Sequence, residues 1–366
     1  MEKQKILIIA SVIFPRLVPR AHRATELAKE LARQGHEVTL CAVLGKYDYS
    51  EFEQKNHIKV HDLGKSKYEW ICSDKENLPL SLWRKGVIFL LRRWLEFPAV
   101  LVGLRTAKYL KTSERYDRMI TIAVPYPIHW GATYAMRHYE HLKGMKWISD
   151  CGDPYMLNPI GTPPFYFKWV EKWWCKTTNY ITVPTEAAMD GYYPEFRNKI
   201  RVIPQGFVFD DSLLALYSKN PVPTFAYSGM VYPQKRDPRP FLDFLSQWNQ
   251  DFRFIVYTNK PAMFQPYQDK MGNKLELRTY VPREQLLYEL SKMDFLVNIR
   301  NESAVQTPSK LIDYYLTHRP ILEITSLFEE KDAFMEFVNG DYHHQKTIDH
   351  PEQFNIVNVA QKFLEL

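Results

Sequence analysis

Short apolar runs, rich in β-branched residues, alternate along the chain with segments of helical periodicity. In the first half, residues 6–10 have the pattern of a buried strand, residues 23–34 that of a helix with one apolar face, and residues 36–43 that of the next strand. Continuous apolar runs separated by amphipathic helices are typical of parallel sheets covered on both faces. We therefore expect a right-handed βαβ unit at the start of the chain.

The same alternation continues and then begins again in the second half. A helix is predicted over residues 130–141, and the remaining strands are predicted over residues 119–124, 146–149, 180–184, 224–228, 252–258, 275–280, 295–299 and 321–324. A chain of 366 residues is too long for one typical domain. We predict an α/β protein with two Rossmann-like halves joined near residues 203–206.

The composition narrows the class of protein. Apolar residues make up 45% and charged residues 25% of the chain, as in ordinary globular proteins. The net charge of +6 fits a phosphorylated substrate or an anionic membrane surface, but the basic residues are too dispersed to favour nucleic acid. No apolar run approaches the ~20 residues of a membrane span, and the first strand is too short for a signal-peptide core. We expect a cytoplasmic protein, and the inner face of the membrane is a candidate location.

The cysteines do not suggest a metal or redox site. Cys41, Cys72, Cys151 and Cys175 lie far apart and form no CxxC pair, so we interpret them as reduced thiols. No acidic pair of the DxD kind follows a suitable strand either. We therefore expect neither a metal nor another cofactor.

One segment of the second half carries the residues that an anion site needs. Thr307 can cap a helix that starts at Pro308, so that backbone N–H groups around Ser309 and the Lys310 ammonium converge on one anion. Asp313 lies about one turn further on, where its carboxylate can accept hydrogen bonds from ribose hydroxyls. An ordinary capped amphipathic helix is the alternative for these residues taken alone.

Short motifs occur in a fixed order along nearly the whole chain. They are KILII at 5–9, RATELAKEL at 23–31, GHEVTL at 35–40, DCGDPY at 150–155, VIPQGF at 202–207, FAYSG at 225–229, VPREQL at 281–286 and TPSK at 307–310. In their order and spacing these motifs resemble those of GT-B-fold glycosyltransferases of the family 4 type. The resemblance implies an α/β GT-B fold, in which two Rossmann-like domains face a central cleft. It also implies a nucleotide-sugar donor, transfer with retention, and a saccharide or lipid-linked acceptor in cell-surface polysaccharide synthesis.

The resemblance divides the chain into an acceptor domain and a donor domain. We expect the acceptor domain at 1–203, the donor domain at 204–348, and a tail at 349–366 whose helix crosses back to the first domain. In the donor domain, Gly229 leaves room for close approach of a ligand to the backbone. Among Lys235, Arg236 and Arg239, Arg236 is our first choice to act with Lys310 on the diphosphate. By the same resemblance, backbone groups at Tyr280 and Val281 hold the base at the carboxyl edge of the sheet.

Two departures from the family pattern stand out. Val305 occupies the place where many members have the first of two acidic residues, eight positions before Asp313, and Glu302 is the nearest acidic substitute. The usual glycine-rich turn after the first strand is replaced by residues 11–20, which include two prolines. Arg16 and Arg20, together with Arg23, can offset this change by binding an anionic acceptor.

The acceptor half offers three residues with chemical potential. His129, Asp150 and Asp153 are each expected just after a strand, where an imidazole or carboxylate could orient the acceptor hydroxyl or take its proton. For His129 the alternative is an ordinary residue at the start of a helix. For Asp150 and Asp153 it is a turn that caps the backbone before Pro154.

Two segments, at 83–97 and 165–174, mix basic and aromatic residues as a helix at a membrane interface does, although core packing gives the same composition. The leading hypothesis is a glycosyltransferase that uses a nucleotide sugar, with possible peripheral membrane contact. The alternatives are another GT-B enzyme, namely a nucleotide-sugar epimerase or an inverting transferase, and a non-catalytic scaffold of the same fold.

Overall fold

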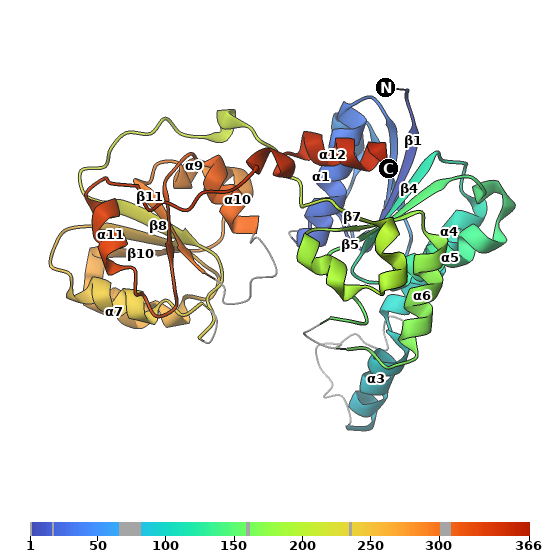
Figure 1. The fold of residues 1–366 in the computed structure, drawn as a ribbon, viewed down its shortest axis with the longest axis horizontal. Helices are drawn as coiled ribbons and strands as arrows, with labels where there is room; N and C mark the ends of the chain where they lie inside the picture. The colour runs from blue at the N-terminus through green and yellow to red at the C-terminus, as the bar shows by residue number, and fades with distance from the viewer. Residues whose placement is uncertain (1, 17, 66–81, 159–161, 234–235, 301–308) are drawn as a thin grey trace. The chain divides into compact units, whose positions relative to one another are not determined.

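The computed structural model describes residues 2–16, 18–65, 82–158, 162–233, 236–300 and 309–366, apart from the side chains of 82–84 and 309. The chain forms two compact units, Met1–Val208 with Gln353–Leu366 (unit 1) and Phe209–Glu352 (unit 2). Each unit is a parallel β-sheet with helices on its faces (Figure 1). Calls that depend on Cys72, Lys235, Glu302, Val305, Thr307 or Pro308 lie outside the described residues.

Unit 1 contains a seven-stranded sheet with the order β3-β2-β1-β4-β5-β6-β7, in which all the pairings are parallel. Its strands are β1 (Lys5–Ala10), β2 (Glu37–Ala42), β3 (Ile58–Asp62), β4 (Arg118–Ala123), β5 (Lys146–Cys151), β6 (Tyr180–Val183) and β7 (Ile200–Val202). Its helices are α1 (Pro19–Arg33), α2 (Ser50–Asn56), α3 (Leu82–Leu95), α4 (Ala99–Thr112), α5 (Pro127–His138), α6 (Phe167–Thr177) and α12 (Ile356–Glu365).

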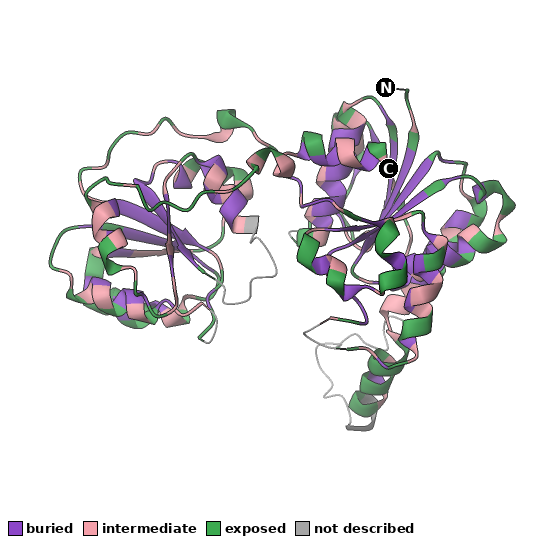
Figure 2. Cartoon of the chain, viewed as in Figure 1, coloured by how far each residue is buried: buried purple, intermediate pink, exposed green. Residues whose placement is uncertain are grey.

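Residues 6–10 of β1 show why this run is apolar at every position. Leu7 and Ile9 belong to one core cluster, which contains residues of α4, α5 and α6. Ile6 and Ile8 belong to the cluster on the other face, with residues of α1 and α12. Because both faces are covered, alternation of apolar and polar residues disappears, and the strand is buried between its helices (Figure 2).

The C-terminal helix α12 completes the second of these clusters. Val359 and Phe363 are fully buried there, and α12 packs on α1. The guanidinium of Arg118 on β4 donates hydrogen bonds to the carbonyls of Phe363 (2.5 Å) and Leu364 (2.8 Å). The end of the chain is thus held in unit 1 by both apolar packing and a buried cation.

Unit 2 contains a five-stranded parallel sheet with the order β10-β9-β8-β11-β12. Its strands are β8 (Thr224–Ser228), β9 (Arg253–Tyr257), β10 (Leu275–Arg278), β11 (Phe295–Ile299) and β12 (Ile321–Ile324). Its helices are α7 (Arg239–Gln247), α8 (Gln265–Met271), α9 (Arg283–Leu290), α10 (Ser309–Leu316) and α11 (Lys331–Val338). Stacked and edge-to-face phenylalanines, among them Phe225, Phe295 and Phe334, fill one face of the sheet.

The strand predictions agree with the structure more closely than the helix predictions do. β8, β11 and β12 have the predicted bounds. Helices α1 and α5 begin earlier than expected, because Pro19 and Pro127 occupy the first helical turn, where a missing N–H costs nothing. β10 ends at Arg278, so Tyr280 and Val281 lie in the following loop. Within the described part of the chain, no helix combines the length and apolarity needed to cross a membrane.

Candidate functional site

The turn after β8 requires glycine. Gly229 follows Ser228, the last residue of β8, and adopts a φ of +140°, which residues with a side chain rarely adopt. A Cβ added there would lie 3.5 Å from the Tyr227 hydroxyl and 3.8 Å from Cδ of Lys310. The backbone after β8 therefore lies directly beside the Lys310 side chain, at the carboxyl edge of the sheet.

Lys310 has an unusual environment for an ammonium group. Its Nζ is buried, lies 4.5 Å from the ring centroid of Tyr227, and has no hydrogen-bond partner among the described residues. Burial and, secondarily, the positive charge of Arg236 hold the pKa of Lys310 well below its usual value. A buried lysine amine without a hydrogen-bond partner among the described residues can pair with an anion, which favours its charged form.

Two tyrosines that the sequence predictions missed hold this lysine in place. The backbone N–H of Ser228 donates a hydrogen bond to the Tyr314 hydroxyl at 2.6 Å, which fixes α10 against the end of β8. Tyr314 lies one helical turn after Lys310, and Tyr227 lies two residues before Gly229. Their spacing from the candidate residues was the only signal in the sequence that could have identified them.

Two of the three basic residues proposed after β8, Arg236 and Arg239, have different surroundings in the structure. Arg236 exchanges backbone hydrogen bonds with Tyr232, in both directions, and its charge reaches Lys310 and Tyr227. Arg239 instead forms an ion pair with Asp237 at the start of α7. Lys310 and Arg236 therefore lie close enough to influence each other electrostatically, whereas Arg239 is paired with Asp237.

The acidic candidate of unit 2 already has a partner. Arg283, the first residue of α9, donates a hydrogen bond from Nε to Oδ1 of Asp313 at 2.8 Å. A ribose bound by Asp313 would share the carboxylate with this guanidinium. Tyr280 is 46% exposed and Val281 is half-buried in the loop that leads to α9, and Ser309 is the first residue of α10.

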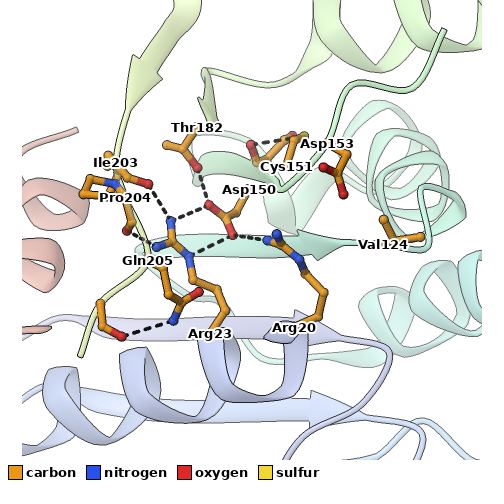
Figure 3. Close-up of polar contacts among 12 residues, drawn as sticks. Arg20, Arg23, Val124, Asp150, Cys151, Asp153, Thr182, Ile203, Pro204 and Gln205 are labelled. Carbon is orange, nitrogen blue, oxygen red and sulfur yellow. Dashed lines mark hydrogen bonds and ion pairs between the residues drawn. The ribbon is translucent and has the colours of Figure 1, made fainter. Parts of the chain in front are cut away.

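In unit 1, Asp150 is enclosed by arginines instead of being open to a substrate (Figure 3). Arg23 on α1 donates to Oδ1 of Asp150 at 2.7 Å and to Oδ2 at 3.1 Å, and Thr182 donates to Oδ1 at 2.7 Å. Burial raises the pKa of Asp150, but the charge and hydrogen bonds of Arg23 outweigh it, so the net pKa lies below the usual range. Asp150 is thus an ionised, fully engaged carboxylate, not an accessible base.

The expectation that Arg23 binds an anionic acceptor is wrong, because its guanidinium is only 4% exposed. Besides Asp150, it bonds the carbonyl oxygens of Ile203, at 3.1 Å, and Pro204. It also lies 5.2 Å from the ring centroid of Phe363 in α12. Arg23 therefore holds segments from opposite ends of unit 1 together.

Arg20, one turn before Arg23, keeps access to solvent. Its side chain is 26% exposed and its Nη1 lies 3.9 Å from Oδ2 of Asp150. The guanidinium occupies the space beside Gly152, where an added Cβ would lie 1.7 Å from Nη2. Asp150 and Gly152 together orient this arginine at the carboxyl edge of the sheet, and Arg16 is exposed in the loop before α1.

His129 does not lie at an accessible edge, and that prediction is wrong. The first turn of α5 points its ring into the core, where it is fully buried against Trp147 and Trp174. Nδ1 lies 2.8 Å from the Thr121 hydroxyl, and Nε2 lies 3.4 Å from Sγ of Cys151. Burial lowers the pKa of His129 to about 3, so the ring is neutral at physiological pH.

Asp153 lies after β5, half-buried, in the loop beside Arg20 (Figure 3). Its backbone carbonyl accepts a hydrogen bond from the Tyr126 hydroxyl, which fixes the course of this loop. Of the three acceptor-side candidates, Asp153 is the one whose side chain is neither enclosed in the core nor bonded to Arg23. The described residues contain no group of three or more His, Cys, Asp or Glu side chains that could hold a metal ion.

Comparison with solved structures shows the fold. HepE from Anabaena, in complex with UDP and glucose, is similar over 99% of this chain and 98% of its own, with a TM-score of 0.59 and 11% identity. A glycosyltransferase from Rickettsia africae is similar over 100% of this chain and 98% of its own, with a TM-score of 0.63 and 13% identity. A UDP-GlcNAc 2-epimerase from Neisseria meningitidis, bound to UDP-GlcNAc, is similar over 99% of this chain and 98% of its own. The TM-score is 0.55 and the sequence identity is 12%.

These likenesses identify the architecture as GT-B, with two parallel-sheet α/β domains. No protein-family model matches the chain, and no curated protein matches it by sequence.

Proposed function

We propose that this protein is a glycosyltransferase that moves a sugar from a nucleotide-sugar donor to a saccharide or lipid-linked acceptor. The observation that carries the proposal is Lys310, whose buried amine has no hydrogen-bond partner among the described residues and lies beside Gly229, within reach of the charge of Arg236. The GT-B fold and the order of the sequence landmarks support the same conclusion.

In this proposal the donor diphosphate binds at the carboxyl edge of the unit 2 sheet. Lys310 and Arg236 neutralise the charge that develops on the diphosphate as the sugar departs, so they act most strongly in the transition state. The backbone at Tyr280 and Val281 holds the base, and Asp313, oriented by Arg283, accepts from the ribose. We also propose transfer with retention and membership of family 4, which the sequence resemblance supports.

On the acceptor side we propose that Arg20 and Arg16 bind an anionic group and that Asp153 orients the acceptor hydroxyl. Asp150 takes a positioning role, because it holds Arg20 and Arg23 and has no exposed surface of its own. His129 is assigned to the core. We place the reaction in cell-surface polysaccharide synthesis at the cytoplasmic face of the membrane, with no metal or other cofactor.

Calorimetric titration with UDP, GDP, ADP, CMP and their sugar conjugates tests the donor site. One nucleotide is expected to bind, and Lys310→Ala is expected to weaken it by about ten- to a hundredfold, because a charge-assisted hydrogen bond is lost. Lys292→Ala is the matched control, since Lys292 pairs with Glu289 on the surface of the same unit. Binding that Lys310→Ala leaves unchanged, or no binding of any nucleotide, would contradict the proposal and favour a non-catalytic scaffold.

A nucleotide-sugar epimerase is the second candidate, because an epimerase is among the similar structures. Incubation of the protein with the nucleotide sugar that binds separates the two reactions. An epimerase converts the sugar without an acceptor, whereas a transferase releases free nucleotide only when an acceptor takes the sugar. The anomeric configuration of the product, read by NMR, distinguishes retention from inversion.

A further inference from the structure

Unit 1 exposes large apolar side chains on two neighbouring segments. Most of α3 is exposed (Figure 2), and Phe89 and Leu90 on it are 65% and 54% exposed. Phe165, just before α6, and Trp169, in its first turn, are 67% and 57% exposed. Apolar side chains of this size scattered singly need no explanation, but a contiguous group of them indicates an interaction surface.

Ring contacts join the two segments into one surface. Trp94 of α3, itself 47% exposed, stacks on Tyr166 with centroids 6.1 Å apart, and Tyr166 donates a hydrogen bond to the Trp94 carbonyl. Phe165 contacts both Tyr166 and Trp169, with centroids 5.9 Å apart in each case. We refer to these four joined side chains, together with the exposed Phe89 and Leu90 of the same helix α3, as the aromatic surface.

The charged residues on the same segments are strongly biased. The exposed basic side chains interleaved with the aromatic surface are Lys85, Arg92, Arg93 and Lys168. The acidic residues within 85–98 and 162–174 are Glu96 and Glu171. Glu96 is half-buried and bonded to Tyr155 at 3.0 Å, and Glu171 is fully buried, so neither offsets the exposed positive charge.

Two of the cations make contacts within these two segments. Arg93 donates from Nη1 to the Thr162 carbonyl at 2.9 Å, which links α3 to the segment before α6. Nζ of Lys168 lies 4.9 Å from the ring centroid of Trp169. Aromatic rings with basic side chains between them match the boundary of an anionic bilayer, where rings enter among the acyl chains and cations contact the headgroups.

We propose that the aromatic surface binds the protein to a lipid bilayer that carries anionic headgroups. The surface belongs to unit 1 alone, so this inference deepens the proposed use of a lipid-linked acceptor but does not depend on nucleotide binding in unit 2. A protein partner would meet the same side chains, but the excess of basic over acidic groups favours the negatively charged membrane.

Co-flotation of the full chain with vesicles tests the proposal without any sugar substrate. Binding to vesicles of phosphatidylglycerol with phosphatidylcholine is expected, and binding to phosphatidylcholine alone is expected to be much weaker. The triple variant Arg92→Gln, Arg93→Gln and Lys168→Gln is expected to lower the affinity by about a hundredfold, since each cation near the surface contributes about fivefold. The matched control is the triple variant Lys55→Gln, Lys59→Gln and Lys111→Gln. It removes the same amount of charge from exposed residues outside the aromatic surface.

A second pair of variants tests the rings. Phe89→Ser with Trp169→Ser is expected to weaken binding by at least about tenfold, because both rings lose burial in the lipid. Leu216→Ser with Leu327→Ser is the control, as these side chains are 98% and 72% exposed in unit 2. The proposal would be overturned if the protein bound both kinds of vesicle equally, or if the variants and their controls had equal effects. It would also be overturned if the protein did not bind vesicles but self-associated, and the ring variants abolished that self-association. Circular dichroism of each variant checks that it is folded.

Discussion

Arg23 and Asp150 are 127 residues apart in the chain, and their side chains form a buried ion pair with Nη2 and Oδ1 2.7 Å apart. The same guanidinium bonds the carbonyls of Ile203 and Pro204. The carboxylate on β5 therefore fixes an arginine on α1, which in turn fixes the segment that follows β7. Because both charges are shielded from water, loss of either one leaves the other uncompensated.

We expect Asp150→Asn to lower the free energy of unfolding of unit 1 by about 3–5 kcal/mol, as the loss of one partner of a buried pair does. Urea denaturation followed by circular dichroism measures this. Glu114→Gln is the control, because it breaks the exposed pair with Lys5 and is expected to cost less than about 1 kcal/mol. If Asp150→Asn and Arg23→Met proved strictly additive in the double variant, the pair would not be coupled.

The low pKa of Lys310 predicts that binding of a nucleotide diphosphate takes up a proton. The free protein has a lowered pKa because the ammonium is buried and lies near Arg236, and a bound anion favours the charged form and raises that pKa. Between the two values, the affinity falls as the pH rises. Calorimetry in buffers of different ionisation enthalpy measures the proton uptake, which Lys310→Ala is expected to remove and Lys292→Ala to preserve. An affinity that does not change with pH, or a proton uptake that Lys310→Ala leaves unchanged, would contradict this linkage between the Lys310 pKa and binding.

Glu171 is expected to make the protein less stable as the pH rises. The carboxyl group is fully buried in α6, and burial raises its pKa to about 7 from 4.5 in spite of the Met156 N–H and the Lys172 charge. Between these values the folded state binds more protons than the unfolded state, so the free energy of unfolding decreases with pH and levels off above about 7.

Glu171→Gln removes this dependence. At pH 8 the variant is expected to be more stable than the parent by on the order of 3 kcal/mol, with little difference near pH 4.5. Thermal and urea unfolding across this range compare the two, with Glu140→Gln, whose side chain is 84% exposed, as the control. Parallel stability curves for parent and variant would show that Glu171 does not titrate near neutrality.

Two glycines in neighbouring helices are expected to respond in opposite ways to alanine. A Cβ on Gly103 of α4 would lie 2.2 Å from the Pro127 carbonyl oxygen at the start of α5, so Gly103→Ala must force these helices apart. We expect a loss of about 1–3 kcal/mol or more, typical of overpacking. A Cβ on Gly86 of α3 would meet nothing within 4 Å, so Gly86→Ala is expected to stabilise the folded protein by up to about 1 kcal/mol. Differential scanning calorimetry measures both, and a stable Gly103→Ala variant would contradict the close contact of α4 and α5.

The sequence by itself determined the strands and the two-fold repetition of the α/β pattern. Leu7, Ile9, Ile6 and Ile8 read as one continuous apolar run because both faces of a parallel sheet are buried, and that signal is local. The position of Gly229 directly after a strand, and the grouping of Thr307, Pro308, Ser309 and Lys310 that predicts an anion site, were also visible locally. Their roles toward a donor remain proposals.

Only the tertiary structure decided what surrounds each candidate side chain. His129 was expected at an open edge, but α5 turns it into the core against Thr121 and Cys151, and Arg23 was expected to bind an acceptor but is occupied by Asp150. Periodicity gives the face of an element on which a residue lies, not the partner that a distant segment brings to it. The burial of Lys310 against Tyr227, and with it the lowered pKa, arises because β8 and α10, more than eighty residues apart, meet at one edge of the sheet.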